Sequence, residues 1–425
     1  QPPAATASGR DAAEDALDLA TPEPAPAALP LFEAAEACGQ AWVERPETAG
    51  SAVNRYTTYL VRGTLGREEA AFSSRRRYSD FEWLRKALVA NFPGVRVPPL
   101  PRKQRAGRFE DAFVEARRSG LEEFLRRCLR KHQFVSTSPV LRRFLQTPED
   151  AMEELRKSLD KRPAADVYQE FKAAFSRELD ALQPPPREEQ LEQCRVLVEG
   201  QLGILRDLGV ALRRAAGAQR VFTAASATVQ ERLASACAAE ASALADANAL
   251  QQPRVQLLAA VRRQNEVMAE APSLHYDILV SAVDLELADA EAMQEALGSL
   301  DQLRQAAEDG RRRADALEAS VRKVQGGGRA EGDEPSSGLG RLFGPRDRAG
   351  QPDRLRRELE QTREEAAVAE EWHAAARSVA AGLEVGAFLA EKVAVHRWVK
   401  DTFGGCAHGT AQALASVWAG LAPKS

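Results

Sequence analysis

Cysteine is scarce in this sequence of 425 residues, and the cysteines stand far apart. None belongs to a CxxC pair, and none stands at zinc-ligand spacing from a histidine. A disulfide framework and a metal site are therefore both unexpected, and a reducing cytosol is the expected compartment. The five cysteines are Cys38, Cys128, Cys194, Cys237 and Cys406.

Long apolar runs are also missing. No stretch approaches the about 18 uncharged apolar residues that a membrane-spanning helix needs. The first residues lack the charged region and apolar core of a secretory signal. We therefore expect any contact with a membrane to be peripheral.

The motifs of common enzymes are absent as well. The sequence contains no GxSxG, no GxxxxGK(S/T) and no HExxH. The run Gly326 to Gly328 follows a helical pattern rather than a strand, so it is not a phosphate-binding loop. The five histidines are scattered, and each is expected at the surface or in the core. We expect neither catalytic activity nor a cofactor.

The charge of the chain is distributed unevenly. The formal net charge is only −4, but 45–147 holds 22 Lys and Arg against 10 Asp and Glu, a local charge of +12. The remainder holds 36 against 52 and is acidic. The basic third favours an anionic ligand, whereas the acidic helical remainder argues against nucleic acid as a partner.

The most informative stretch runs from Arg75 to Lys103 and reads RRRYSDFEWLRKALVANFPGVRVPPLPRK. Guanidinium groups suit phosphate oxygens because they are planar, charged and bidentate, and a lysine after a stiff proline loop adds a point charge. The alternative for the arginines alone is an exposed charge run on an edge strand. The whole stretch favours a pocket for an anionic headgroup.

The residues around this stretch predict a small sheet covered by helices. Between Trp42 and Arg77, β-branched and aromatic residues recur between turn signals, which is typical of three short antiparallel strands. A helical period follows, with Asp80 as its expected N-cap. Pro93 ends that helix. Two further helical patterns follow before Pro148.

A basic run, Tyr, a small residue, Asp-Phe and then Pro-x-x-Pro-x-Lys resemble the signature of PX domains, the phosphoinositide-binding modules of sorting nexins. The resemblance covers 38–147 and implies an α+β fold that prefers phosphatidylinositol 3-phosphate. It also implies that Arg77 holds the 3-phosphate and that Tyr78 packs under the inositol ring. Lys103 would meet the 1-phosphate, and Arg117 would reach the ring hydroxyls.

Two segments flank this region. Residues 1–37 are rich in Ala, Pro and acidic residues and are expected to be a disordered tail. The segment 148–186 is expected to be a linker that contains an amphipathic helix. Its apolar face carries Phe171 and Phe175, which either insert into a membrane surface or dock against a neighbouring domain.

Residues 187–425 carry three long helical patterns with almost no strand character. The first ends between Gly217 and Gln252. The second reaches about Gln325 and includes a heptad-like apolar series, and its Pro253 and Pro272 are expected to start or kink a helix. A glycine- and proline-rich loop over 326–351 separates it from the third.

This architecture resembles the sorting nexins that carry a C-terminal all-α BAR domain, and most closely their plant and algal members. The resemblance implies a dimer, with itself or with another sorting nexin, which binds phosphoinositide membranes on endosomes. It also implies that the protein senses or induces curvature and acts with the retromer core subunits. The alternative is a coiled-coil scaffold or tether that uses its PX domain only as a membrane address.

Overall fold

The computed structural model describes residues 39–50, 55–66, 70–101, 111–131, 133–134, 138–182, 188–243, 248–326, 351–419 and 421. The expected tail over 1–37, Lys103 and nearly all of the loop over 326–351 lie outside the described residues. The chain forms two compact units. One includes Leu208–Val283 and Val393–Ser425, and the other includes Glu33–Asp207 and Asp284–Lys392.

The predicted three-stranded antiparallel sheet is confirmed. Its strands are β1 (Gly39–Ala49), β2 (Tyr56–Leu65) and β3 (Ala70–Arg77), in the order β1-β2-β3. Gly63 pairs with Ala41 across the sheet, and a Cβ at Gly63 would lie only 1.9 Å from the Gln40 carbonyl oxygen. This position therefore requires glycine.

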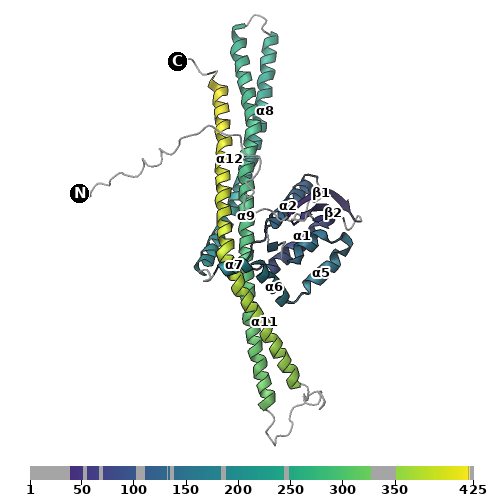
Figure 1. Cartoon of the computed structure of the whole chain (residues 1–425). Coiled ribbons are helices and arrows are strands. Elements are labelled where there is room, and N and C mark those ends of the chain that lie inside the picture. The colour runs from purple at the N-terminus through teal and green to yellow at the C-terminus, as the bar shows by residue number, and fades with distance from the viewer. Residues whose placement is uncertain are drawn as a thin grey trace, which may run out of the picture. The chain divides into compact units, whose positions relative to one another are not determined.

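Three helices accompany the sheet: α1 (Tyr78–Asn91), α2 (Asp111–Arg130) and α4 (Pro139–Gln146) (Figure 1). Helix α2 contacts β1, where Arg118 Nη1 donates to the Val43 carbonyl at 2.6 Å and Glu122 accepts from the Val43 N–H at 3.1 Å. These side chains satisfy backbone groups at that edge of the sheet. The buried ring of Phe81 packs edge-on against those of Phe124 and Phe144.

The start of α1 corrects one detail of the prediction. Asp80 is not the N-cap, because the helix begins two residues earlier at Tyr78 and Arg77 occupies the cap position. Asp80 instead accepts a hydrogen bond from the Arg77 backbone N–H at 2.6 Å. A carboxylate in the first turn satisfies a backbone donor there and complements the helix dipole.

The single amphipathic helix predicted in the linker is divided in two, and further helical pieces precede it. A short turn, η1 (Glu149–Ala151), leads into α5 (Met152–Asp160). Helices α6 (Ala164–Ala174) and α7 (Ser176–Ala181) follow, and they meet at Phe175. The predicted apolar face is thus shared between two helices.

The three predicted long helical segments are all present. They are α8 (Glu188–Ala243), α9 (Asn248–Gly326) and a third made of α11 (Gln351–Val379), a π-helical turn (Ala380–Glu384) and α12 (Val385–Ala419). Neither Pro253 nor Pro272 starts a helix, because α9 begins at Asn248 and continues through both residues. None of the described helices combines the length and the apolar character that crossing a bilayer requires.

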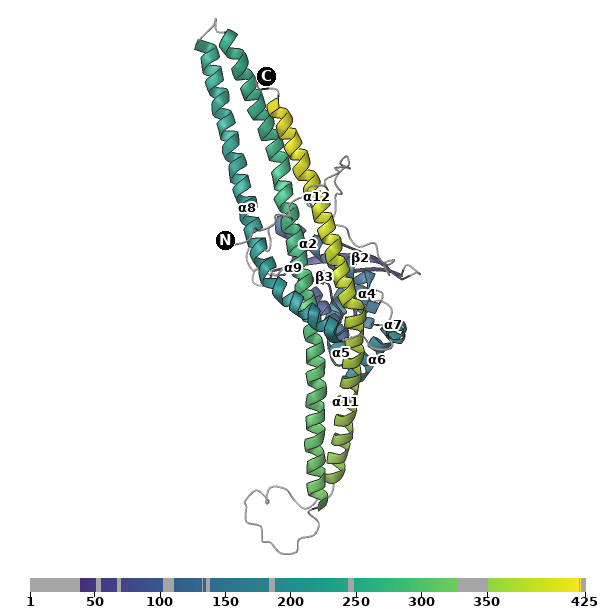
Figure 2. The ribbon, with the colours of Figure 1, turned by 90° about the vertical axis from the view of Figure 1, so that its left-hand side faces the viewer.

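Part of the predicted heptad-like apolar series packs within the chain where α9 and α11 run side by side (Figures 1 and 2), and we call this contact the seam between α9 and α11. Gly310 lies against Ala366, whose Cβ would be only 2.8 Å from a Cβ at the glycine. The absence of that side chain allows the two helices to approach closely. The cluster consists of Ala314, Val321 and Leu359, with Leu317 and Leu355 packed against it.

In the unit that includes Leu208–Val283, a polar layer joins α8 to α9. The Asn265 side chain is buried, and its amide donates to the Gln230 side chain at 2.8 Å and to the Ser226 carbonyl at 3.1 Å. A buried, satisfied amide in an apolar helix pair favours one alignment over its neighbours. His275 of α9 packs edge-on against Phe403 of α12 in the same unit.

Candidate functional site

The alternation of β3 separates the three consecutive arginines. Arg75 pairs with Glu47 of β1 and donates to the Thr58 hydroxyl at 3.2 Å. Arg76 points to the opposite face, and Arg77 is the last residue of the strand. The three side chains therefore have three different environments, and the interpretation as an edge-strand charge run describes only Arg75.

Arg76 is a core residue with 0% exposure. Its guanidinium donates to the carbonyls of Phe144 and Thr147, with Nε 3.0 Å from the Phe144 oxygen, and lies 5.1 Å from the Phe144 ring centroid. Burial lowers the pKa of Arg76 to about 10. The side chain ties β3 to α4 and is not available to a phosphate.

Arg77 is the exposed member of the run and stands at the start of α1. Its guanidinium carbon lies 3.7 Å above the Tyr56 ring centroid, and Nη2 donates to the Tyr56 hydroxyl at 3.0 Å. No ion pair to a carboxylate is recorded for Arg77 within the described part of the chain. Its remaining N–H groups are therefore oriented by an aromatic support and open to an anion.

Tyr78 and Arg117 form the second half of the site. The Tyr78 hydroxyl donates to the Pro101 carbonyl at 2.7 Å, and the Arg117 guanidinium carbon lies 4.5 Å from the Tyr78 ring centroid. Phe113 supports the same guanidinium at 4.3 Å. Burial raises the pKa of the Tyr78 hydroxyl, with a further contribution from Glu82.

One polar atom of Arg117 is left over. Its Nε is buried and has no hydrogen-bond partner within the described residues, and the same holds for the Tyr59 hydroxyl. Burial raises the pKa of Tyr59, while the Arg117 charge lowers it. The Arg117 guanidinium and the Tyr59 hydroxyl therefore interact with each other inside the fold.

Of the four residues implied by the PX resemblance, Arg117 stacks on Tyr78, Arg77 directly precedes Tyr78 with its guanidinium on Tyr56, and Lys103 lies outside the described residues. The structure adds Tyr56, which sequence reasoning missed. Tyr56 is recognisable only once Arg77 is placed opposite Thr58, because that register brings the tyrosine near the guanidinium.

The other side of Tyr78 borders a cavity of about 540 Å³ between α1, the proline segment and α9. Three of its lining residues are acidic, namely Glu82, Glu291 and Glu295. Arg85 is already paired with Glu295 there. Lys86 also lines the cavity, so the three carboxylates stand beside two cations and the lining carries only a small excess of negative charge.

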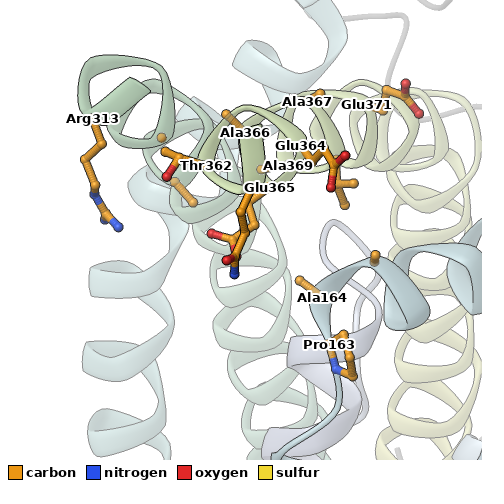
Figure 3. A pocket seen from close by; sticks show the side chains of 15 residues that line it. Pro163, Ala164, Arg313, Thr362, Glu364, Glu365, Ala366, Ala367, Ala369 and Glu371 are labelled. Atoms are coloured by element: carbon orange, nitrogen blue, oxygen red, sulfur yellow. The ribbon is translucent and has the colours of Figure 1, made fainter. Parts of the chain in front are cut away.

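A larger cavity of about 790 Å³ lies between the start of α6 and the helices α9 and α11 (Figure 3). Pro163 and Ala164 face Glu365 and its neighbours on α11. Three glutamates and a single arginine, Arg313, line it. This charge balance does not suit a phosphorylated ligand.

The hypothesis that Phe171 and Phe175 insert into a membrane is corrected by the structure. Phe171 is 0% exposed and Phe175 2% exposed. Their ring centroids are 4.9 Å apart, both lie within 6.4 Å of Phe92, and Trp372 of α11 lies 6.3 Å from Phe171. The rings dock against the neighbouring domain instead, because the end of α1 and one face of α11 form an apolar surface that covers them.

Comparison with known proteins identifies the domain that carries this site. The PX domain family model matches residues 64–148. Sorting nexin 1 of Arabidopsis thaliana is 36% identical over 148 residues, which are 33% of this chain and 36% of that protein. Sorting nexin-3 of Aspergillus fumigatus is 40% identical over 110 residues, which are 25% of this chain and 77% of that protein. The match therefore spans only about a third of the plant protein.

A solved structure extends the likeness in fold to the helices. The cryo-EM structure of the SNX-BAR Mvp1 tetramer is similar with a TM-score of 0.57 and 14% sequence identity, over 90% of this chain and 99% of that chain. The fold is therefore an α+β PX domain followed by an all-α BAR domain. The chain belongs to the sorting nexins of the PX-BAR type.

Proposed function

We propose that this sorting nexin binds the headgroup of phosphatidylinositol 3-phosphate at the surface formed by Arg77, Tyr78 and Arg117. The observation that carries the proposal is the exposed Arg77 guanidinium, which is held on Tyr56 at the residue directly before Tyr78 of the Arg117–Tyr78 stack. Arg77 holds the 3-phosphate, the Tyr78 ring supports the inositol, and Arg117 donates to ring hydroxyls. Lys103 enters on the family resemblance alone, as the partner of the 1-phosphate.

On the scale of the cell, we propose a cytoplasmic protein that acts as a peripheral membrane component on endosomes. It takes part in retromer-linked sorting into vesicles or tubules and senses or induces curvature as a homodimer or a heterodimer with another sorting nexin. Two headgroup sites in one dimer raise the effective affinity without any new contact. This proposal is supported by the PX and BAR domains and by the sorting nexin relatives.

The headgroup proposal is tested with a panel of vesicles of matched charge in a phosphatidylcholine background. We expect full-length protein to sediment with vesicles that contain phosphatidylinositol 3-phosphate, and much less with those that contain the 4-phosphate or phosphatidylserine. Equal binding to all anionic vesicles at physiological salt would indicate general electrostatic attraction and would contradict a specific pocket.

The proposed dimer surface lies within the unit that includes Leu208–Val283. Apolar side chains on α8 and α9 remain exposed there although the seam between α9 and α11 is filled. In the proposed dimer these side chains would be covered by the partner chain. The set comprises Leu208, Val210, Val221, Phe222, Val229, Val255 and Leu257.

We expect Phe222→Ser to weaken self-association, because Phe222 is 54% exposed in the single chain and its burial in a dimer would contribute about 2 kcal/mol. Sedimentation velocity across a concentration series measures the effect. Arg214→Ala, an exposed polar change on the same helix, is the control. A compact monomer at micromolar concentration for the unsubstituted protein would contradict the dimer itself.

The scaffold alternative remains because Phe171 and Phe175 are buried in the protein. Their rings therefore do not insert into one leaflet of the membrane and do not bend it. Under this alternative the protein binds vesicles and dimerises but does not reshape them. Electron microscopy of vesicles that contain phosphatidylinositol 3-phosphate separates the two functions, since only the curvature function produces tubules.

A further inference from the structure

A buried ion cluster joins the PX domain to the long helices. At its centre is Arg96, whose side chain is only 3% exposed. The guanidinium pairs with Glu391 of α12 and has Nη1 3.9 Å from Asp289 Oδ2 of α9. The Arg96 backbone N–H donates to Glu384 Oε2 at 3.3 Å. One residue therefore contacts three carboxylates from the helical region.

Two further cations of the PX domain complete the cluster. Arg127 lies 2.6 Å from Asp289 Oδ1, and Lys131 Nζ lies 2.6 Å and 2.8 Å from the two oxygens of Glu384. Three cations thus meet three carboxylates, which gives the charge compensation that burial requires. Glu384 closes the π-helical turn Ala380–Glu384, and such turns often occur where a helix presents a functional side chain.

A second contact fixes the same part of the chain. The Gly94 N–H donates to Ser299 Oγ of α9 at 2.9 Å. Gly94 has φ +78, and a Cβ there would lie 2.8 Å from Leu300 Cδ2 and 2.9 Å from the Ala376 carbonyl oxygen. The residues just before Arg96 are therefore pressed against both α9 and α11.

The segment anchored in this way leads directly to the headgroup site. Arg85 of α1 donates to the Pro98 carbonyl at 3.0 Å and also pairs with Glu295 of α9. Pro101 accepts the hydrogen bond from the Tyr78 hydroxyl at 2.7 Å. Pro98, Pro99 and Pro101 restrict the backbone conformations of the segment that joins these two contacts. A continuous series of contacts thus connects the long helices to Tyr78.

We propose that Arg96 is a positioning residue of the headgroup site. By anchoring the segment Val95–Pro101 on Glu384, Glu391 and Asp289, it fixes the Pro101 carbonyl that orients Tyr78. The affinity of the headgroup site then depends on carboxylates of the BAR helices that never touch lipid. This inference rests on the proposed phosphoinositide function.

The test uses full-length protein and the variant Glu391→Gln, which removes one charge from the partly exposed partner of Arg96. Affinity for vesicles that contain phosphatidylinositol 3-phosphate is measured together with amide hydrogen exchange. We expect affinity to fall about three- to tenfold, with exchange accelerated in 94–100 but not in the sheet. Glu391→Asp, which keeps the charge, should restore affinity to within about twofold.

Glu370→Gln is the matched control, because Glu370 makes an exposed ion pair with Arg311 at 3.6 Å on the neighbouring part of the third helix. It should leave both readouts unchanged. A second variant, Arg96→Met, removes the cation at the centre of the cluster. Its folded fraction should bind vesicles that contain phosphatidylinositol 3-phosphate more weakly than Glu391→Gln does.

Two results would overturn the inference while leaving the proposed function intact. One is unchanged affinity of Glu391→Gln, with or without faster exchange in 94–100. The other is an affinity loss accompanied by equally faster exchange throughout the sheet, which would show a purely structural role. Failure of the unsubstituted protein to bind these vesicles would instead overturn the proposed function and, with it, this inference.

Discussion

Replacing Arg77 with alanine is expected to reduce binding to vesicles that contain phosphatidylinositol 3-phosphate by about 10- to 100-fold. A charge-assisted hydrogen bond contributes about 1.5–3 kcal/mol, and Arg77 supplies the exposed guanidinium of the site. The fold should survive, because the Arg77 side chain is exposed and rests on the ring and hydroxyl of Tyr56. Vesicle sedimentation measures the loss, and circular dichroism verifies the fold.

Arg62→Ala is the control for this prediction. Arg62 is an exposed arginine of β2 that pairs with Glu44, so the change removes the same charge from the same sheet at a different place. We expect its binding in a phosphatidylcholine background to stay close to that of the unsubstituted protein. Equal losses for Arg62→Ala and Arg77→Ala would mean that total charge, and not a pocket at Arg77, determines binding.

Phe171→Ala is expected to lower the free energy of unfolding by about 3–5 kcal/mol. Phe171 is 0% exposed and packs against Phe92, Phe175 and Trp372, so truncation leaves a cavity where the linker helix meets α1 and α11. Urea unfolding followed by circular dichroism measures the change.

Lys172→Ala provides the comparison, because Lys172 is the next residue along α6 and is exposed. A surface change of this kind usually alters stability by at most about 0.5 kcal/mol. An unfolding midpoint of Phe171→Ala equal to that of Lys172→Ala, combined with a loss of tubulation, would argue against docking of the ring.

Much of the PX fold was predictable because its signals are local. The alternation between Trp42 and Arg77 indicated three strands, and the apolar spacing of Phe81, Leu84 and Leu88 indicated a helix with a buried face, which α1 has. The order of motif residues indicated Arg77 as the anion contact. Arg76, its neighbour, shows the limit of such prediction. Adjacent side chains of a strand point to opposite faces, and the sequence does not say which face is buried, so it does not separate a core arginine from an exposed one.

The remaining features depend on contacts between distant parts of the chain. Arg96 looks like one more basic residue in a basic region, but its partners Glu384 and Glu391 are 288 and 295 residues away. The apolar face that carries Phe171 has the same helical period whether lipid or protein covers it. An amphipathic pattern reports that a face is covered and does not report by what.

The central claim is that one headgroup site in each chain recognises the 3-phosphate, and calorimetric titration with soluble inositol 1,3-bisphosphate tests it most directly. This compound carries the two phosphates assigned to Arg77 and Lys103 and no lipid tails. The account predicts saturable binding with one site per chain and displacement of the protein from vesicles that contain phosphatidylinositol 3-phosphate. The absence of saturable binding, with vesicle binding unaffected by the same compound, would contradict it.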